Sequence, residues 1–156
     1  MADVVLSAVS SGEDLAHVRA LFEEYAASIG FSLSFQGFER ELAELPGRYA
    51  PPSGQILLAR VDRAVAGCVA LRDLGEGVCE MKRLFVRPAF NGKGCGRRLA
   101  SAIVEEARRA GYRTMRLDTA PSMQAAAGLY ESLGFHDIPP YNDNPMPGVR
   151  FLELAL

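Results

Sequence analysis

The sequence has few residues of the kinds that bind metals or form disulfides. Its 156 residues include three cysteines and two histidines. Cys68, Cys79 and Cys95 form no Cys-x-x-Cys pair, and His17 and His136 stand alone, which argues against a metal site. We therefore expect the three cysteines to be reduced, as they are in a cytoplasmic protein.

An excess of either charge and a long hydrophobic run are also missing. Lys and Arg total 17 against 19 Asp and Glu, so no general field attracts nucleic acid or an anionic membrane. No run approaches the ~20 apolar residues of a membrane span, and the early acidic residues Asp3, Glu13 and Asp14 argue against a signal peptide. With no repeat or linker, we expect one domain over residues 1–156, without nucleic-acid or membrane partners.

Hydrophobic residues make up 49% of the chain, enough for an ordinary core. The first half predicts a strand over 3–9 and a helix that begins at a capping box, Ser10 with Glu13. One apolar stripe continues that helix to Gly30 through Leu15, Val18, Phe22, Tyr25 and Ile29. A second helix follows over about 35–46, then a polar, mobile loop between Pro46 and Pro52. Strands over 55–61 and 65–71 flank a hairpin turn at Asp62-Arg63, and a strand over 78–86 follows a turn at 75–77.

The second half of the chain alternates helix and strand. We predict a helix over 94–110 with Leu99, Ile103 and Ala107 buried, a strand over 114–119, and a helix capped by Ser122. A proline-rich loop then leads to a final strand over 149–156. The order β-α-α-β-β-β-α-β-α-β-β predicts an α/β (α+β) fold with a mixed central sheet and helices on both faces.

A glycine-rich stretch, Asn91-Gly92-Lys93-Gly94-Cys95-Gly96, leads directly into the helix at 94. Glycine allows a ligand to approach the backbone closely, and the first N–H groups of a helix are unpaired and lie at its positive end. The stretch therefore predicts an anion site suited to a diphosphate. Lys93, Arg97 and Arg98 add charge for a further phosphate.

Two familiar nucleotide motifs do not fit this stretch. A Walker A loop needs glycine at position 87, which is Arg, and Ser or Thr after Lys93, where Gly94 stands. The dinucleotide motif Gly-x-Gly-x-x-Gly fails because Arg97 occupies its third glycine position. A purely structural glycine turn remains open at this point.

The strand before the loop carries Glu80, Lys82 and Arg83 where a central strand usually excludes charge, which often marks a functional site. Three runs follow in order: Leu84-Phe85-Val86-x-Pro88, then Gly92-Lys93-Gly94-Cys95-Gly96-Arg97-x-Leu99, then Ala126-x-x-Leu129-Tyr130-x-x-x-Gly134-Phe135. Through these runs the sequence resembles the GNAT superfamily of N-acetyltransferases. The resemblance covers about residues 78–136, and the element order outside it fits the same fold.

The resemblance implies where coenzyme A would bind. The strand would splay from its neighbour and pair its backbone with the pantetheine arm, while loop amides would hold the pyrophosphate. The implied cofactor residues are Leu84, Phe85, Val86, Asn91, Gly92, Lys93, Gly94, Cys95, Gly96 and Arg97. Two positions depart from the family pattern: Asn91 stands where Gln or Arg is usual, and Met123 where Asn is frequent.

The implied reaction transfers an acetyl group from acetyl-CoA to a primary amine by direct attack within a ternary complex. The resemblance places Tyr130 to protonate the leaving thiolate, and an ordinary pKa near ~10 would suit a proton donor. We take Glu80 as the general base, directly or through a water, and a backbone N–H near Val86 as the oxyanion donor. The alternatives are a surface Glu80 paired with Lys82 or Arg83, and a Tyr130 that only packs.

The acceptor is less closely specified by the sequence. Asp118 would bind a substrate ammonium or be a surface residue. We expect Cys95 to stand in the loop because its side chain is small, and not to act as a nucleophile. The regions 31–52 and 139–148 are expected to wall the acceptor pocket, with Tyr49, Tyr141, Asp143, Glu39 and Glu44. These side chains suit a small cationic or amino-acid-like amine rather than a protein amine.

Two other kinds of protein remain open at the level of sequence. One is a non-catalytic acyl-CoA-binding or sensing module on the same fold, and the other is an interaction protein whose glycine loop is structural. The terminal strand over 150–156 would suit either a homodimer contact or an ordinary sheet edge.

Overall fold

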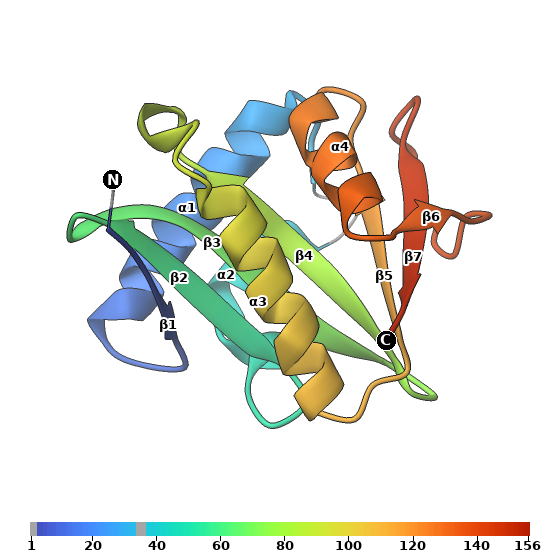
Figure 1. Ribbon diagram of the computed structural model, residues 1–156, viewed down its shortest axis with the longest axis horizontal. Coiled ribbons are helices and arrows are strands. Elements are labelled where there is room, and N and C mark those ends of the chain that lie inside the picture. Colours follow the sequence, from blue (N-terminus) through green and yellow to red (C-terminus); the bar gives the residue numbers. More distant parts are fainter. Residues whose placement is uncertain (1–2, 34–36) are drawn as a thin grey trace.

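One mixed sheet runs through the part of the chain that this computed structural model describes, residues 3–33 and 37–156 (Figure 1). Its seven strands lie in the order β1-β2-β3-β4-β5-β7-β6. They are β1 Val4–Ala8, β2 Gln55–Val61, β3 Ala64–Gly75, β4 Val78–Val86, β5 Thr114–Thr119, β6 His136–Asp137 and β7 Arg150–Ala155. Only the β4–β5 pairing is parallel within the described chain, and the other neighbours pair antiparallel.

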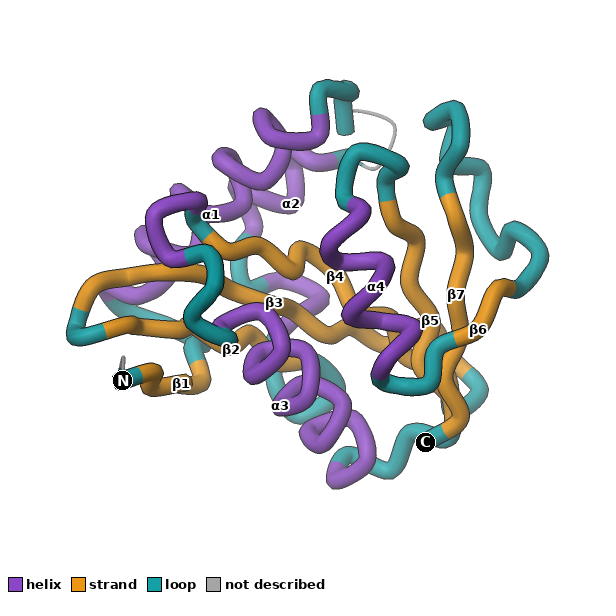
Figure 2. The backbone as a smooth tube through the Cα atoms, turned by 45° about the horizontal axis from the view of Figure 1, so that its top comes forward, coloured by secondary structure: helices purple, strands orange, loops and turns teal. Residues whose placement is uncertain are grey.

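Among the described residues, four α-helices cover the two faces of the sheet (Figures 1 and 2). They are α1 Glu13–Ile29, α2 Phe38–Glu44, α3 Cys95–Arg109 and α4 Gln124–Ser132. Helices α1 and α2 lie on one face, and α3 and α4 on the other. The predicted fold class and element order are confirmed.

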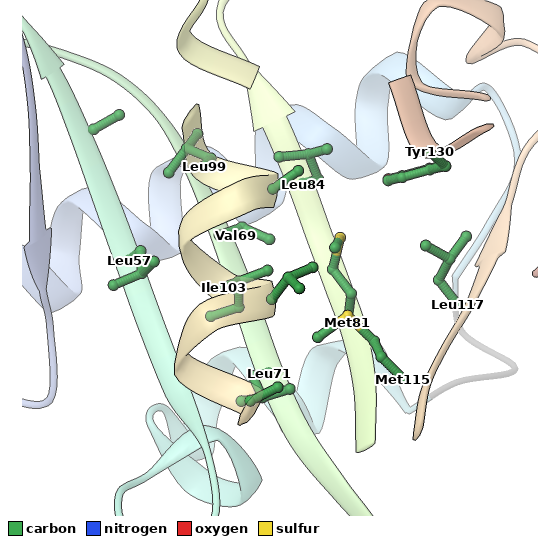
Figure 3. Packing of buried hydrophobic residues seen from close by; sticks show 14 of the residues in the cluster. Leu57, Val69, Leu71, Met81, Leu84, Leu99, Ile103, Met115, Leu117 and Tyr130 are labelled. Carbon is green, nitrogen blue, oxygen red and sulfur yellow. The ribbon is translucent and has the colours of Figure 1, made fainter. Parts of the chain in front are cut away.

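The core on the α3 side joins the helix to strands β1, β2, β3, β4, β5 and β7, and Figure 3 shows part of it. Leu99, Ile103 and Ala107 of α3 are fully buried, as the stripe in the sequence predicts. They pack over Leu57 of β2 and Val69 of β3. Burial of each large aliphatic side chain stabilises the fold by about 1.5–3 kcal/mol, so α3 is held firmly against the sheet.

The core on the α1 side confirms most of the predicted stripe. Val18, Phe22 and Ile29 are buried, and the helix ends at Gly30, whose φ of 73° is left-handed. Phe38 of α2 is buried in the same core. The part of the predicted second helix at 35–36 lies outside the described residues.

The predicted side-chain caps are wrong for both helices. Helix α1 begins at Glu13 with Gly12 before it at a φ of 79°, and no side chain caps it. Helix α4 begins at Gln124 after Met123, again with no side-chain cap, because a turn from Met123 N–H to the Ala120 carbonyl (3.0 Å) sets its start. Backbone turns thus begin both helices.

The loop between Pro46 and Pro52 also differs from its prediction as a polar segment. It contains a 3₁₀ turn, Gly47–Tyr49, and Tyr49 is only 2% exposed. The Tyr49 ring packs edge-on against Phe22, with centroids 6.0 Å apart. An aromatic side chain therefore anchors this loop in the core.

Candidate active site

Strands β4 and β5 separate after a short parallel stretch. Their pairing joins Val78–Glu80 to Thr114–Arg116 and stops there. The rest of β4, through Val86, diverges from β5, and α4 lies beside the opening (Figure 1). This is the splay that the sequence resemblance implies, and it leaves one side of β4 without a strand partner.

A bulge in β4 changes which face its side chains point to. Arg83 has a left-handed φ of 62°, and the register with β3 shifts between Cys68 and Ala70. Strict alternation from Met81, which packs on the α3 side, would place Arg83 on that side too. Instead its guanidinium lies over the ring of Phe38 on the α2 side, at 5.1 Å. The bulge therefore aims a cation at the region under α2.

The same strand offers backbone donors to the opening. The N–H of Arg87 donates to the Ala66 carbonyl in β3, at 2.8 Å. Because N–H directions alternate along a strand, those of Leu84 and Val86 point away from β3. They face the side that β5 has left.

A cleft of about 450 Å³ occupies this opening. Eight of the ten predicted cofactor residues line it: Leu84, Phe85, Val86, Asn91, Gly92, Gly94, Cys95 and Gly96. Lys93 and Arg97 are exposed and do not. Arg97 instead donates to the Ser132 hydroxyl at 2.9 Å, which connects α3 to α4. The lining also includes Ser28 of α1, which no motif in the sequence indicated.

The glycine stretch forms a left-handed turn into α3. Gly92 and Gly94 have φ values of 80° and 76°, and a Cβ on either would meet nothing within 4 Å. The first amide of the helix to bond back is that of Arg98, to the Gly94 carbonyl at 3.1 Å. The preceding amides are therefore available at the positive end of the helix, beside open space.

Cys95 is 2% exposed, and burial raises the pKa of its thiol. A buried thiol of raised pKa is a poor nucleophile, which agrees with a role based on size.

Tyr130 of α4 lies at the inner end of the cleft. It lines a small cavity that shares Leu84 and Met123 with the larger one and also contains Lys82 and Asp118. Its ring contacts Phe135 edge-on, with centroids 5.7 Å apart. Burial, with smaller contributions from Tyr25 and Asp118, raises the pKa of Tyr130 well above its ordinary value. The expectation of an ordinary pKa is therefore wrong.

Glu80 is completely buried on the α1 side of β4. Its Oε1 accepts from Arg72 Nε at 2.7 Å, and its Oε2 accepts from the Tyr141 hydroxyl at 2.6 Å. The alternative of a surface carboxylate paired with Lys82 or Arg83 is wrong. Arg72, which lies opposite Glu80 in the β3–β4 register, was missed because its strand was predicted to end at Leu71.

Asp118 is also buried rather than a surface residue, with its side chain 8% exposed. Lys82 Nζ lies 3.9 Å from Oδ1, and the side-chain amides of Asn142 and Asn144 donate to Oδ2 at 3.0 and 3.1 Å. Burial alone would raise the pKa of Asp118, but these partners outweigh it and lower the pKa. For Lys82, burial lowers the pKa.

The structure buries some of the residues that we expected to line the acceptor pocket and exposes the others. Tyr49 is buried and Tyr141 is half-buried, whereas Glu39, Glu44 and Asp143 are exposed. Over residues 3–33 and 37–156, no group of three His, Cys, Asp or Glu side chains could hold a metal ion. No helix among those residues is long and apolar enough to span a membrane.

The splayed strands, the glycine turn and the cleft between them define an N-acyltransferase of the acyl-CoA-binding type. A family model described as the Acetyltransferase (GNAT) family matches residues 18–135. The chain belongs to this family, and the prediction of an N-acetyltransferase is confirmed.

Known acetyltransferases match this chain over almost its whole length. An N-acetyltransferase of Schizosaccharomyces pombe is 39% identical over 156 residues, which cover 99% of this chain and 96% of that protein. The crystal structure of an acetyltransferase from Streptococcus agalactiae has a TM-score of 0.79 and 19% identity, covering 98% of each chain. The structure of YncA from Salmonella typhimurium with acetyl-CoA has a TM-score of 0.66 and 22% identity, covering 97% of this chain and 93% of that one. The similarity to these two structures shows that this chain has the same fold.

Proposed function

We propose that the protein transfers the acetyl group of acetyl-CoA to the primary amine of a small molecule, by direct attack within a ternary complex. The observation that carries this proposal is the continuity of the cleft. It extends from the unpaired amides of α3 along the free edge of β4 and meets the cavity of Tyr130. The presence of acetyl-CoA in the YncA structure supports the choice of donor.

Acetyl-CoA would bind mainly through the protein backbone. The pyrophosphate would accept from the amides of Gly92–Gly96, where the open space beside Gly92 and Gly94 leaves room for it. The pantetheine amides would pair with the exposed edge of Leu84–Val86, in place of the absent β5 partner. Lys93 and Arg97 lie outside the cleft and would contribute only charge, and Asn91 lines its rim.

The reaction forms a C–N bond and breaks the C–S bond of the thioester. In our proposal the attacking amine loses its proton to Glu80 through a water, since each carboxylate oxygen can accept a further hydrogen bond beside Arg72 and Tyr141. The N–H of Val86 stabilises the oxyanion. Tyr130 gives its proton to the leaving thiolate, and its raised pKa keeps it protonated until that moment.

A non-catalytic acyl-CoA-binding module on the same fold is the second candidate. The polar cluster beside the cleft favours the enzyme, because buried charged groups such as Glu80 and Lys82 are costly unless they serve a purpose. We also propose that residues 1–156 act as one domain in the cytoplasm, which the three free cysteines support. The terminal strand β7 is not the sheet edge that the sequence suggested, because it pairs with β5 on one side and with the short β6 on the other. That the protein forms a homodimer remains a proposal, and a free edge of β7 does not support it.

The test is a panel of small amines incubated with acetyl-CoA and purified protein, with the free CoA thiol as readout. We expect amine-dependent thiol release for at least one class of amine. Calorimetric titration with acetyl-CoA accompanies it. Binding without release for every amine would favour the sensing module, and no binding would overturn both candidates.

A further inference from the structure

Two side chains control the passage from the acyl-CoA cleft to the cavity of Tyr130. Among the described residues, only Leu84 and Met123 line both spaces. Leu84 belongs to the free edge of β4, and Figure 3 shows it beside Tyr130 of α4. Met123 directly precedes α4, where its N–H donates to the Ala120 carbonyl at 3.0 Å. A donor that extends from the cleft to Tyr130 therefore passes both side chains.

The two spaces on either side of this passage differ greatly in size. The cleft has a volume of about 450 Å³, whereas the cavity of Tyr130 has about 10 Å³. The smaller volume is room for about one water-sized group. Its wall also includes the buried pair of Lys82 and Asp118, with 3.9 Å between Nζ and Oδ1. An apolar chain is poorly placed against buried charges, because it cannot replace their polar contacts. The cavity therefore admits one small group.

The proposed chemistry determines which part of the donor lies at the passage. Pantetheine pairs with the backbone of residues 84–86, and Tyr130 gives its proton to the sulfur, so the thioester lies beside Leu84 and Met123. The acyl group follows directly after the thioester carbonyl. An acetyl group presents a single methyl to the small cavity, whereas each longer acyl chain has to place further methylenes there.

The side chain of Met123 occupies space that a longer acyl chain would need. Met123 is half-buried and packs against the core on the α1 side, which includes Phe85, Ala120 and Met146. A methionine side chain is unbranched and fills irregular gaps of this kind. Removal of its atoms beyond Cβ would leave an apolar space next to the thioester, in contact with that core.

We propose that Met123 restricts the acyl donor to acetyl-CoA by filling the space beside the thioester. This proposal rests on the proposed function, because that function places the thioester beside Tyr130. Met123 determines specificity and takes no part in proton transfer.

The test compares acetyl-CoA, propionyl-CoA and butyryl-CoA as donors to the same amine. Because one methylene in a filled pocket changes kcat/KM by roughly 10–200-fold, wild-type kcat/KM should fall by about tenfold or more from acetyl to propionyl, and further for butyryl. Met123→Ala should bring propionyl-CoA to within about threefold of acetyl-CoA, since the added methylene then has room. Met123→Leu, which keeps an apolar side chain of similar size, should keep the wild-type preference.

Met146→Ala is the matched control for a loosened core. Met146 is buried in the same α1-side core but lines neither the cleft nor the cavity of Tyr130. The same truncation there removes core contacts without widening the passage, so the preference for acetyl-CoA should stay as in the wild type. If Met146→Ala admitted propionyl-CoA as well as Met123→Ala does, the proposal would be overturned.

Calorimetric titration without an amine separates this proposal from acetyl transfer. The wild type should bind butyryl-CoA about tenfold or more weakly than acetyl-CoA, and Met123→Ala should bind the two alike. That result would support the role of Met123 even if no amine were acetylated, and equal wild-type affinities in that case would overturn it. Where transfer occurs, equal wild-type kcat/KM for acetyl-CoA and propionyl-CoA would overturn the role of Met123 and leave acetyl transfer intact.

Discussion

Arg83 and Glu41 form a two-bond ion pair, with both N–O distances at 2.9 Å, between the bulge of β4 and helix α2. Their side chains are 1% and 13% exposed, and the guanidinium also lies over the rings of Phe38 and Tyr25. The pair therefore fixes a short helix to the strained residue of the strand that borders the cleft. Arg83 lines the small cavity of Tyr130, and Glu41 lines a second cavity under α2, so the pair lies between the two.

Removal of Glu41 should destabilise the protein strongly. Glu41→Ala leaves a buried guanidinium without a counter-charge, and we expect a loss of about 3–5 kcal/mol in the free energy of unfolding. Glu44→Ala removes another α2 carboxylate. The side chains of Arg40 and Glu44 in this pair are 83% and 56% exposed, so its loss should cost about 0.5 kcal/mol or less. Urea denaturation measures both values. Similar losses for the two variants would show that the buried pair does not hold α2.

The glycine turn allows a test of backbone binding. Gly94→Ala and Gly111→Ala each place alanine at a left-handed residue, with φ of 76° and 92°, and neither Cβ meets an atom within 4 Å. Both should lose about 1–2 kcal/mol of stability from backbone strain. Only Gly94 lines the cleft, so only its variant should weaken acetyl-CoA binding, by about tenfold in a calorimetric titration. An equal effect of Gly111→Ala would mean that strain, not contact, lowers the affinity.

Tyr130→Phe tests the proton donor. Loss of the hydroxyl should lower kcat by about 10²-fold, because the thiolate then leaves unprotonated, with little change in acetyl-CoA affinity. Tyr112→Phe is the matched control, since its hydroxyl donates to the Ser53 carbonyl at 2.6 Å, away from the cleft. The measurement is the steady-state kcat of both variants with the preferred amine. An unchanged kcat in Tyr130→Phe would assign this tyrosine to packing alone.

The stability of the protein should depend on Asp118 at low pH. Its pKa is lowered in the folded state, so its charged form contributes stability above the ordinary value of 3.8. That contribution is lost as pH falls from this value through the folded pKa. Asp118→Asn should therefore flatten the fall in unfolding free energy over that range and lower stability at pH 7. Asp143→Asn, an exposed carboxylate nearby, should keep the wild-type profile. If Asp118→Asn left the pH dependence of the unfolding free energy unchanged, the charge of Asp118 would not contribute to stability.

Much of the fold could be read from the sequence because it depends on local signals. The turns at Asp62-Arg63 and 75–77 and the apolar stripe of α3 specify their elements within a few residues. The motif around Gly94 likewise predicts a cleft at the start of α3, and the structure has one there, since backbone geometry near a helix start is a local property. The order of elements follows from these signals.

The polar side of the site could not be read in the same way, because its contacts join distant segments. Arg72 meets Glu80 across a hairpin, and Tyr141 reaches the same carboxylate from 61 residues along the chain. The direction of Arg83 depends on a bulge that reverses the alternation of β4, and no residue type in the strand indicates it. The predicted helix caps were wrong for a related reason, because backbone turns begin these helices instead of the predicted side chains.

The most direct measurement follows the acetyl group itself. Acetyl-CoA labelled with ¹³C in the acetyl carbonyl is mixed with the protein and the preferred amine, and the label is followed by NMR as thioester turns to amide. Direct acetyl transfer predicts one N-acetylated amine for each CoA released, and no loss of thioester when the amine is left out. Release of free acetate in place of the amide, or a thioester that persists with every amine that binds, would contradict it.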